Sequence, residues 1–280
     1  SYLFATCLVS LNIFLIVTSQ EMRVYIFTFF LISLSLIFFL NLYKEDKNKM
    51  FTKNFFLFPF FTFIAILSHP FAIIVLASMI VFLILDYFLF LGNHVKVNIS
   101  LILVSILTVG FLYHYLNYVS HNGIGWIEQP GIKFFTNFYF SKFFGSRLLG
   151  IIHLLTLVIL LICLRKKIER NKEIIFLIIL LVFSYFIPLV YGYFIKPIIF
   201  PKYIIFVLIP IILIISILVF LIENKIIKKL MISFLILINF VNHFTESTFK
   251  QFISEKQRFN PNFERAFEII ENSKIKRVNF

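Results

Sequence analysis

The chain has 280 residues, of which 61% are hydrophobic and 41 are phenylalanine, and it carries a formal net charge of +13. So large an apolar share exceeds what a soluble domain of this length can bury, and several continuous apolar runs reach the roughly 18 residues that a membrane-spanning helix needs. The composition excludes a soluble globular protein and predicts an all-α multi-pass membrane protein. A β-barrel is disfavoured because its strands would alternate apolar and polar residues.

Apolar runs alternate with short polar breaks along the chain, and this pattern predicts about nine membrane spans. The third and the last run are short. The runs together form a transmembrane domain over residues 1–243, and residues 244–280 form a tail. The predicted spans are 1–18, 24–42, 54–68, 71–92, 99–118, 148–164, 174–194, 203–222 and 230–243.

Lysine and arginine are divided unevenly between the two sets of loops. About half of the 26 Lys and Arg residues lie in the loops 43–53, 93–98, 165–173 and 223–229. Because cytoplasmic loops of membrane proteins are enriched in these residues, we expect this set to face the cytoplasm. Topology also accounts for the positive net charge, so no nucleic acid is expected as a partner. The segments expected outside are 19–23, 69–70, 119–147, 195–202 and the tail after 244.

Two of the outer segments have a pattern of their own. The loop 119–147 mixes Gly, Pro and Trp with aromatic residues at near-helical spacing, which is typical of a helix lying in the membrane interface. The tail 244–280 has the pattern of an amphipathic helix, a turn and the first residues of a strand, which predicts the start of a small soluble αβ unit. Since the chain begins inside an apolar run and stops within this unit, we expect a fragment truncated at both ends.

Most ionisable residues outside the basic loops lie on the predicted outer side. Of the six histidines, only His94 is expected inside. Such a bias predicts one common polar site at the outer surface, although Lys and Arg also extend toward the interface at ordinary helix ends. The residues of this outer set are Arg23, His69, His114, His121, Glu128, His153, Lys196, Lys202 and His243.

Three short stretches contain the candidate site residues. In "VTSQEMRVYIFTFF" (17–30), Arg23 can hold a phosphate through two parallel hydrogen bonds, or it can serve as a headgroup anchor paired with Glu21. In "LSHPFAI" (67–73), His69 can contact a phosphate or a sugar hydroxyl, or it can simply precede the turn at a proline. The stretch "YGYFIKPIIFPKYIIFV" (191–207) places the pair Lys202-Tyr203 at the entry of a span.

In this order and on this face, the three stretches resemble membrane glycosyltransferases of the GT-C superfamily. The nearest group is the protein O-mannosyltransferase and aminoarabinose-transferase type, which uses polyprenyl-phosphate sugars. In that family a span opens on the pattern S-x-E-x-R-x-Y. The residues that match it here are Ser19, Glu21, Arg23 and Tyr25.

The other two stretches extend this resemblance. A T-H or H-P step of the family corresponds to Ser68-His69-Pro70, and the family's P-x-x-x-x-R-Y entry to a late span corresponds to Pro197 through Lys202-Tyr203. Here a lysine replaces the usual arginine. The family's catalytic acid lies in a first outer loop that has no counterpart in this sequence, so no catalytic residue is assigned and the fragment alone should be inactive.

The resemblance implies sugar transfer on the extracytoplasmic face from a polyprenyl-phosphate donor to a glycan, lipid or protein acceptor. An acidic base would deprotonate the acceptor, and basic residues would stabilise charge on the leaving phosphate. We expect an integral protein of a bacterial or archaeal cytoplasmic membrane, in contact with membrane lipids, with no cofactor or with a divalent metal ion. The substrate-binding residues expected are Glu21, Arg23, Tyr25, His69, Lys202 and Tyr203.

Two other classes of protein fit the same pattern. A polysaccharide polymerase or ligase is also multi-pass and carries basic residues and histidines in a long outer loop. A transporter places ionisable residues near the middle of the membrane. The one acid inside an apolar run is Asp86, which lies close to the inner end of its span. An interfacial position therefore explains Asp86 better than a transport site.

Overall fold

The computed structural model describes residues 2–21, 23–45, 51–92, 94–121, 127–169 and 171–244, except the side chains of 114 and 116–121. Every regular element in these residues is helical, which confirms the all-α class. The elements are α1 (Tyr2–Ser10), α2 (Ile13–Ser19), α3 (Tyr25–Lys44), α4 (Lys53–Ser68), η1 (Pro70–Ala72), α5 (Ile73–Phe90), α6 (Val95–His121), α7 (Ile132–Asn137), α8 (Phe140–Phe143), α9 (Arg147–Cys163), α10 (Arg165–Ile168), α11 (Lys172–Phe194), η2 (Ile205–Val207), α12 (Leu208–Phe220) and α13 (Lys225–Asn242).

Four helical segments within the described residues are long and apolar enough to cross a membrane. They are Tyr25–Lys44, Pro70–Phe90, Val95–Tyr113 and Lys172–Phe194. The helices α1 and α2 meet at an angle of 59° and add a fifth segment if the bent pair is one span. These four or five segments indicate a multi-pass integral membrane protein.

The prediction of nine spans is wrong, because several of the apolar runs form helices too short to cross a membrane. The runs 54–68, 148–164 and 203–222 form shorter helices. The 16 residues of α4, for example, rise only about 24 Å, against a hydrocarbon thickness of roughly 30 Å. The first run is interrupted at Asn12, whose side chain accepts a hydrogen bond from the backbone of Leu15 and so starts a new helix.

Two predictions for the outer segments have different outcomes. The described part of the loop 119–147 contains two short helices, α7 and α8, in place of one interfacial helix. The tail 244–280, with its expected αβ unit and domain boundary, lies outside the described residues beyond Phe244. It stays a prediction.

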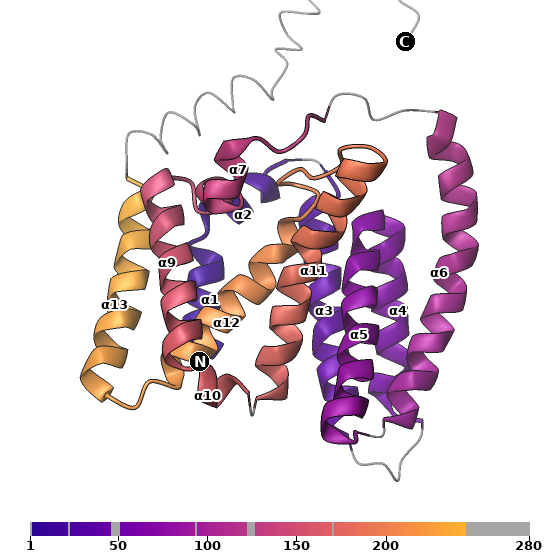
Figure 1. The fold of residues 1–280 in the computed structure, drawn as a ribbon, viewed down its shortest axis with the longest axis horizontal. Helices are drawn as coiled ribbons and strands as arrows, with labels where there is room; N and C mark the ends of the chain where they lie inside the picture. The colour runs from indigo at the N-terminus through magenta and orange to yellow at the C-terminus, as the bar shows by residue number, and fades with distance from the viewer. Residues whose placement is uncertain are drawn as a thin grey trace, which may run out of the picture.

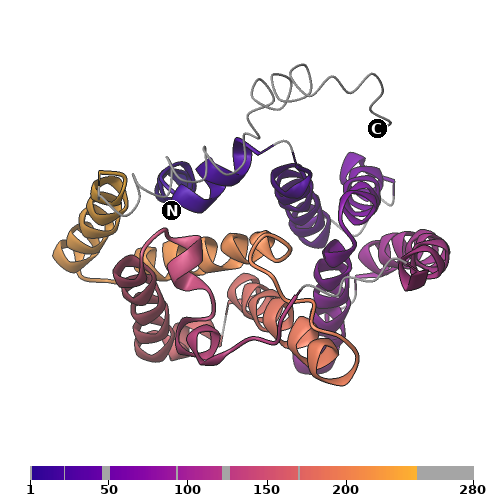
Figure 2. The same cartoon turned by 90° about the horizontal axis from the view of Figure 1, so that it is seen from above.

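The helices stand side by side, with α13 and α6 at the two ends of the row and α12 between them (Figures 1 and 2). Most residues of α12 are buried, as expected for a helix that is apolar on all sides. Phenylalanines join the neighbouring helices: the rings of Phe39, Phe82 and Phe176, from α3, α5 and α11, lie 5.2–6.3 Å apart. This apolar core fixes how the helix ends are placed.

The two ends of the helix row carry different groups (Figure 1). We call the upper end the hairpin end, because α2 is joined to α3 there, and it also holds residues 68–72 and 195–204. We call the lower end the basic end. It holds the connections around residues 43–45, 91–97, 165–172 and 221–225. Segments far apart in the sequence meet at each end.

The orientation of these two ends can be tested by labelling. In a variant with Cys7 and Cys163 replaced by serine, Lys133→Cys and Lys166→Cys each introduce one exposed thiol, at the hairpin end and the basic end respectively. Because the basic end is expected in the cytoplasm, a membrane-impermeant maleimide added to whole cells should label residue 133 and spare residue 166. The reverse pattern would overturn the orientation and the outer site with it.

Candidate functional site

An ion pair joins the hairpin between α2 and α3 to the segment that precedes η2. The Lys202 ammonium donates to Glu21 Oε1 across 181 residues of sequence. Only 10% of the Glu21 side chain and 17% of the Lys202 side chain are exposed. A lone charge in such a place costs several kcal/mol, so each group depends on the other. The sequence suggested Arg23 as the partner of Glu21, whereas in the structure the Glu21 carboxylate pairs with Lys202.

Tight turns place the two charges. After α2 the backbone N–H of Glu21 bonds to the carbonyl of Thr18, and that of Arg23 bonds to the carbonyl of Glu21, so α3 starts within a few residues. On the other side, α11 ends at Phe194, and a turn closes from the N–H of Tyr203 to the carbonyl of Phe200. The result is that Glu21 lies inside the protein while Arg23 is exposed.

Three aromatic rings from the three predicted stretches meet beside this ion pair. The ring centroids of Tyr25 and His69 are 5.6 Å apart, those of Tyr25 and Tyr203 are 5.8 Å apart, and those of His69 and Tyr203 are 5.2 Å apart. Phe71 packs against both His69 and Tyr203. The structure thus brings together residues that the sequence singled out in separate stretches.

Arg23 stands at the exposed edge of this cluster. It forms no ion pair with a carboxylate of the described residues. Burial raises the pKa of the Tyr203 hydroxyl and the neighbouring Tyr25 adds to this shift, while the positive charge of Arg23 opposes it. Arg23 is therefore close enough to Tyr203 for its charge to act there.

His69 caps the turn between α4 and η1 and keeps one hydrogen-bond donor on its ring. Its Nδ1 accepts a hydrogen bond of 3.3 Å from the backbone N–H of Phe71, which starts η1 after the end of α4. Burial lowers the pKa of His69 to about 4, so the ring is neutral near neutral pH. With Nδ1 accepting, the neutral ring carries its proton on Nε2. His69 is thus both the turn residue and a hydrogen-bond donor.

One acceptor in the cluster has no partner among the described residues. Glu21 Oε2 is buried and accepts no hydrogen bond, although Oε1 of the same carboxylate is paired. The hydroxyl of Thr18, three residues earlier, is in the same condition. A buried polar atom without a partner is rare in a folded protein. A ligand hydroxyl that reaches Glu21 would satisfy it.

Other residues of the predicted outer set are used for packing. His153 is buried on α9, where its Nδ1 lies 2.9 Å from the carbonyl of Leu149 and its Nε2 accepts from the Asn239 amide. The Nε2 of His243 lies 2.8 Å from the carbonyl of Leu11. These contacts attach α13 to its neighbours. Glu128 is exposed, and the side chains of His114 and His121 lie outside the described part.

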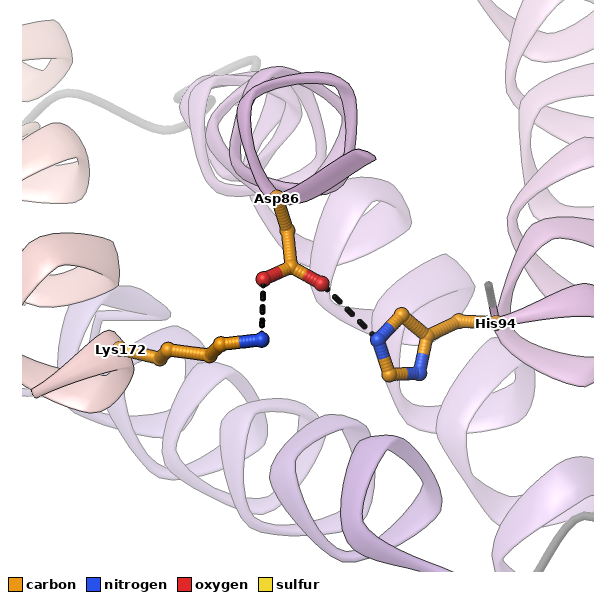
Figure 3. A network of polar contacts seen from close by, with 3 residues as sticks. All are labelled: Asp86, His94 and Lys172. Atoms are coloured by element: carbon orange, nitrogen blue, oxygen red, sulfur yellow. Dashed lines mark hydrogen bonds and ion pairs between the residues drawn. The ribbon is translucent and has the colours of Figure 1, made fainter. Parts of the chain in front are cut away.

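A second polar cluster, which the sequence did not single out, lies at the basic end (Figure 3). The Asp86 side chain is fully buried, with its Oδ1 2.7 Å from Lys172 Nζ and its Oδ2 2.9 Å from His94 Nε2. Asp86 is therefore enclosed by protein at the basic end of the helix row. The one signal in the sequence was a single acid within an apolar run, and nothing there identified its partners.

Within the described residues, no three His, Cys, Asp or Glu side chains gather as they would around a metal ion. Both polar clusters instead combine one carboxylate with a lysine and aromatic rings.

Comparison with known proteins gives no match: no family model, no curated protein and no solved structure is similar to this chain. The resemblance to the GT-C superfamily therefore rests on the three short stretches of the sequence alone.

The pairing of Glu21 with Lys202 predicts a specific pattern of stability. Glu21→Gln or Lys202→Met alone should lower the free energy of unfolding by about 3 kcal/mol, because each removes the ion-pair partner of a largely buried charge. The double variant should lose less than the sum of the two, because no charge remains unpaired. Thermal unfolding of the purified protein in detergent measures these differences.

The exposed pair Lys167–Glu223 provides the control, since 38% and 86% of its side chains are exposed. Glu223→Gln should leave the melting temperature nearly unchanged, as for ordinary surface ion pairs. Strictly additive effects of Glu21→Gln and Lys202→Met would show that the two charges do not interact.

Proposed function

We propose that the chain is part of a membrane glycosyltransferase that moves a sugar from a polyprenyl-phosphate donor to a glycan, lipid or protein acceptor on the extracytoplasmic face. The observation that supports it best is the meeting of the three stretches at the hairpin end, where Tyr25, His69 and Tyr203 lie within 5.2–5.8 Å of one another. A membrane of a bacterium or archaeon is the proposed location.

Arg23 is the proposed contact for the donor phosphate. Its guanidinium is exposed, and it precedes α3 by two residues. The first turn of α3 has no side-chain cap, since the N-cap residue is Val24. Backbone N–H groups at such a helix start favour an anion, and an arginine beside them adds a planar fork that fits a phosphate.

Lys202 has a different role in this proposal from the one suggested by its sequence position. Because its ammonium is paired with Glu21, its charge is largely compensated. It acts as a positioning residue that holds the hairpin, and Arg23 with it, against the segment before η2. The substitution of lysine for the family's arginine is consistent with this role, because a single contact to Glu21 needs no bidentate group.

The sugar would lie against the aromatic rings next to Arg23. Sugar sites combine apolar or aromatic walls with a few polar groups that fix orientation. Here the His69 imidazole can donate a hydrogen bond to a sugar hydroxyl. Glu21 Oε2, which has no partner among the described residues, can accept one. The hydroxyls of Tyr25 and Tyr203 supply further polar groups at the same place.

In the proposed reaction, the acceptor oxygen attacks the sugar carbon that is bonded to the donor phosphate. The carbon–oxygen bond to the phosphate breaks, and the leaving lipid phosphate gains negative charge. Arg23 would stabilise that charge, an effect that is strongest in the transition state. No residue of this chain is assigned as the base that takes the acceptor proton. The exposed Glu128 is not proposed for it.

A transporter is the second candidate, because one observation favours it. The buried Asp86 with its partners Lys172 and His94 lies within or beside candidate spans, where ionisable groups are often part of a transport pathway. Each charge is already paired, however, which suits a fixed link between helices. A polysaccharide polymerase or ligase would use the same outer residues, and no feature of the described residues favours it.

Substitution of Arg23 tests the glycosyltransferase proposal. In the full-length protein, Arg23→Ala should lower sugar transfer by about 10²–10³-fold, the effect of removing one group that stabilises transition-state charge. Arg23→Lys should recover only part of the activity, because a point charge cannot reproduce the fork. The assay uses membranes with a lipid-linked sugar donor.

The matched control is Arg147→Ala, which removes another exposed arginine at the start of an apolar helix. This variant should transfer sugar at nearly the wild-type rate. Near-normal transfer by Arg23→Ala would mean that the hairpin is a plain turn with a headgroup anchor.

A further inference from the structure

Two neighbouring segments at the basic end carry an excess of positive charge. One is the short helix α10, and the other is the start of α13 (Figure 1). Lys167 joins them, because its ammonium donates to the carbonyl of Leu221 and to the Glu223 carboxylate just before α13. We call the basic side chains of the two segments the α10–α13 patch. They are Arg165, Lys166, Lys167, Lys225, Lys228 and Lys229.

The acids around this patch do not cancel its charge. Glu169 and Glu223 are the acids that adjoin the two segments. Among the described residues, Lys167 is the one member of the patch that forms an ion pair, and its partner is Glu223. The helices α1, α9 and α12, against which α13 packs, contain no acidic residue. The patch therefore keeps a net positive charge.

The start of α13 is an unfavourable place for lysines unless an anion lies near. The N-terminal end of a helix carries a partial positive charge, which favours acids in the first turn. The first turn of α13 has no acid, and Lys225, Lys228 and Lys229 all lie within its first five residues. The N-cap Asn224 satisfies backbone N–H groups there but adds no negative charge. An external anion would relieve this repulsion.

The rest of α13 turns its apolar side chains away from the protein. The side that packs inward contains the amides Asn239 and Asn242, which bond to His153 and to the carbonyl of Phe144. This is the reverse of a helix on a water-soluble surface, which turns its polar side outward. Lipid tails are the surroundings that suit the outward face. Its exposed side chains include Ile226, Leu230, Phe234, Leu237, Phe240 and Val241.

We propose that the α10–α13 patch binds the phosphate headgroups of anionic phospholipids, whose acyl chains lie along the exposed apolar face of α13. Two features together select this partner: the uncancelled positive charge attracts an anionic surface, and the apolar face beside it suits hydrocarbon. A nucleic acid or an acidic protein would match the charge and leave the apolar face uncovered. The patch lies at the opposite end of the helix row from the hairpin, so it does not depend on the glycosyltransferase proposal (Figure 1).

Native mass spectrometry of the full chain, in micelles with equal amounts of phosphatidylglycerol and phosphatidylcholine, tests the headgroup contact. The wild-type protein should retain phosphatidylglycerol with about tenfold preference, the effect expected of one or two lysines near an anionic lipid. The triple variant Lys225→Gln, Lys228→Gln and Lys229→Gln should retain the two lipids nearly equally. Added salt should lower the wild-type preference, because exposed charges are screened.

The matched control is the triple variant Lys133→Gln, Lys142→Gln and Lys196→Gln, which removes the same charge from the hairpin end. It should keep the wild-type preference, and melting curves compare the stability of the two triple variants. An equal loss of preference in both triple variants would show that net charge alone attracts the lipid, and would overturn the proposal. Equal retention of the two lipids by the wild type would also overturn it, in favour of a soluble polyanion as the partner.

Fluorescence quenching tests where the acyl chains lie. The chain has one tryptophan, Trp126, and in a variant with Trp126→Phe the change Phe234→Trp places a single tryptophan on the exposed face of α13. In bilayers with equal amounts of the two lipids, bromine on the phosphatidylglycerol chains should quench this tryptophan more strongly than bromine on the phosphatidylcholine chains. Equal quenching would mean that no anionic lipid gathers at α13, which contradicts the proposal.

Discussion

A carboxylate and an ammonium that leave water together can stay charged only if they remain in contact, and this constraint shapes the hairpin end of the protein. Glu21 and Lys202 come from segments 181 residues apart, yet each is largely buried and each depends on the other. Their contact fixes Tyr25, on the first turn of α3, beside Tyr203, which follows Lys202 directly. Because Arg23 belongs to the same hairpin, its position also follows from this ion pair.

Packing in the middle of the helix row keeps the helix ends that carry this ion pair in place. The phenylalanines of α3, α5 and α11 pack in the middle of the helix row, so the ends of these helices are held in fixed relation. A second charged cluster, Asp86 with Lys172 and His94, joins α5, α11 and the start of α6 at the basic end. The protein thus has a buried carboxylate paired with a lysine at both ends of an apolar core.

The sequence predicted the membrane class and the three stretches of the hairpin end, because apolar composition and short polar breaks are local properties. It did not predict which charges pair. Arg23 is two residues from Glu21 and seemed its natural partner by distance along the chain, whereas the pairing with Lys202 depends on how helices pack. The same limit applies to Asp86, whose partners come from other helices. The number of spans was overestimated because runs such as 54–68 and 148–164 were counted as spans although their helices are too short to cross a membrane.

The central claim is that the Glu21–Lys202 pair holds the hairpin against the segment before η2, and thiol cross-linking in membranes measures this most directly. In a variant without Cys7 and Cys163, Tyr25→Cys and Tyr203→Cys replace two neighbouring rings, whose centroids are 5.8 Å apart, and leave the ion pair intact. A short bifunctional thiol reagent should join the two positions efficiently, and the added change Lys202→Met should sharply lower the yield. Absence of the cross-link, or a yield that Lys202→Met leaves unchanged, would contradict the claim.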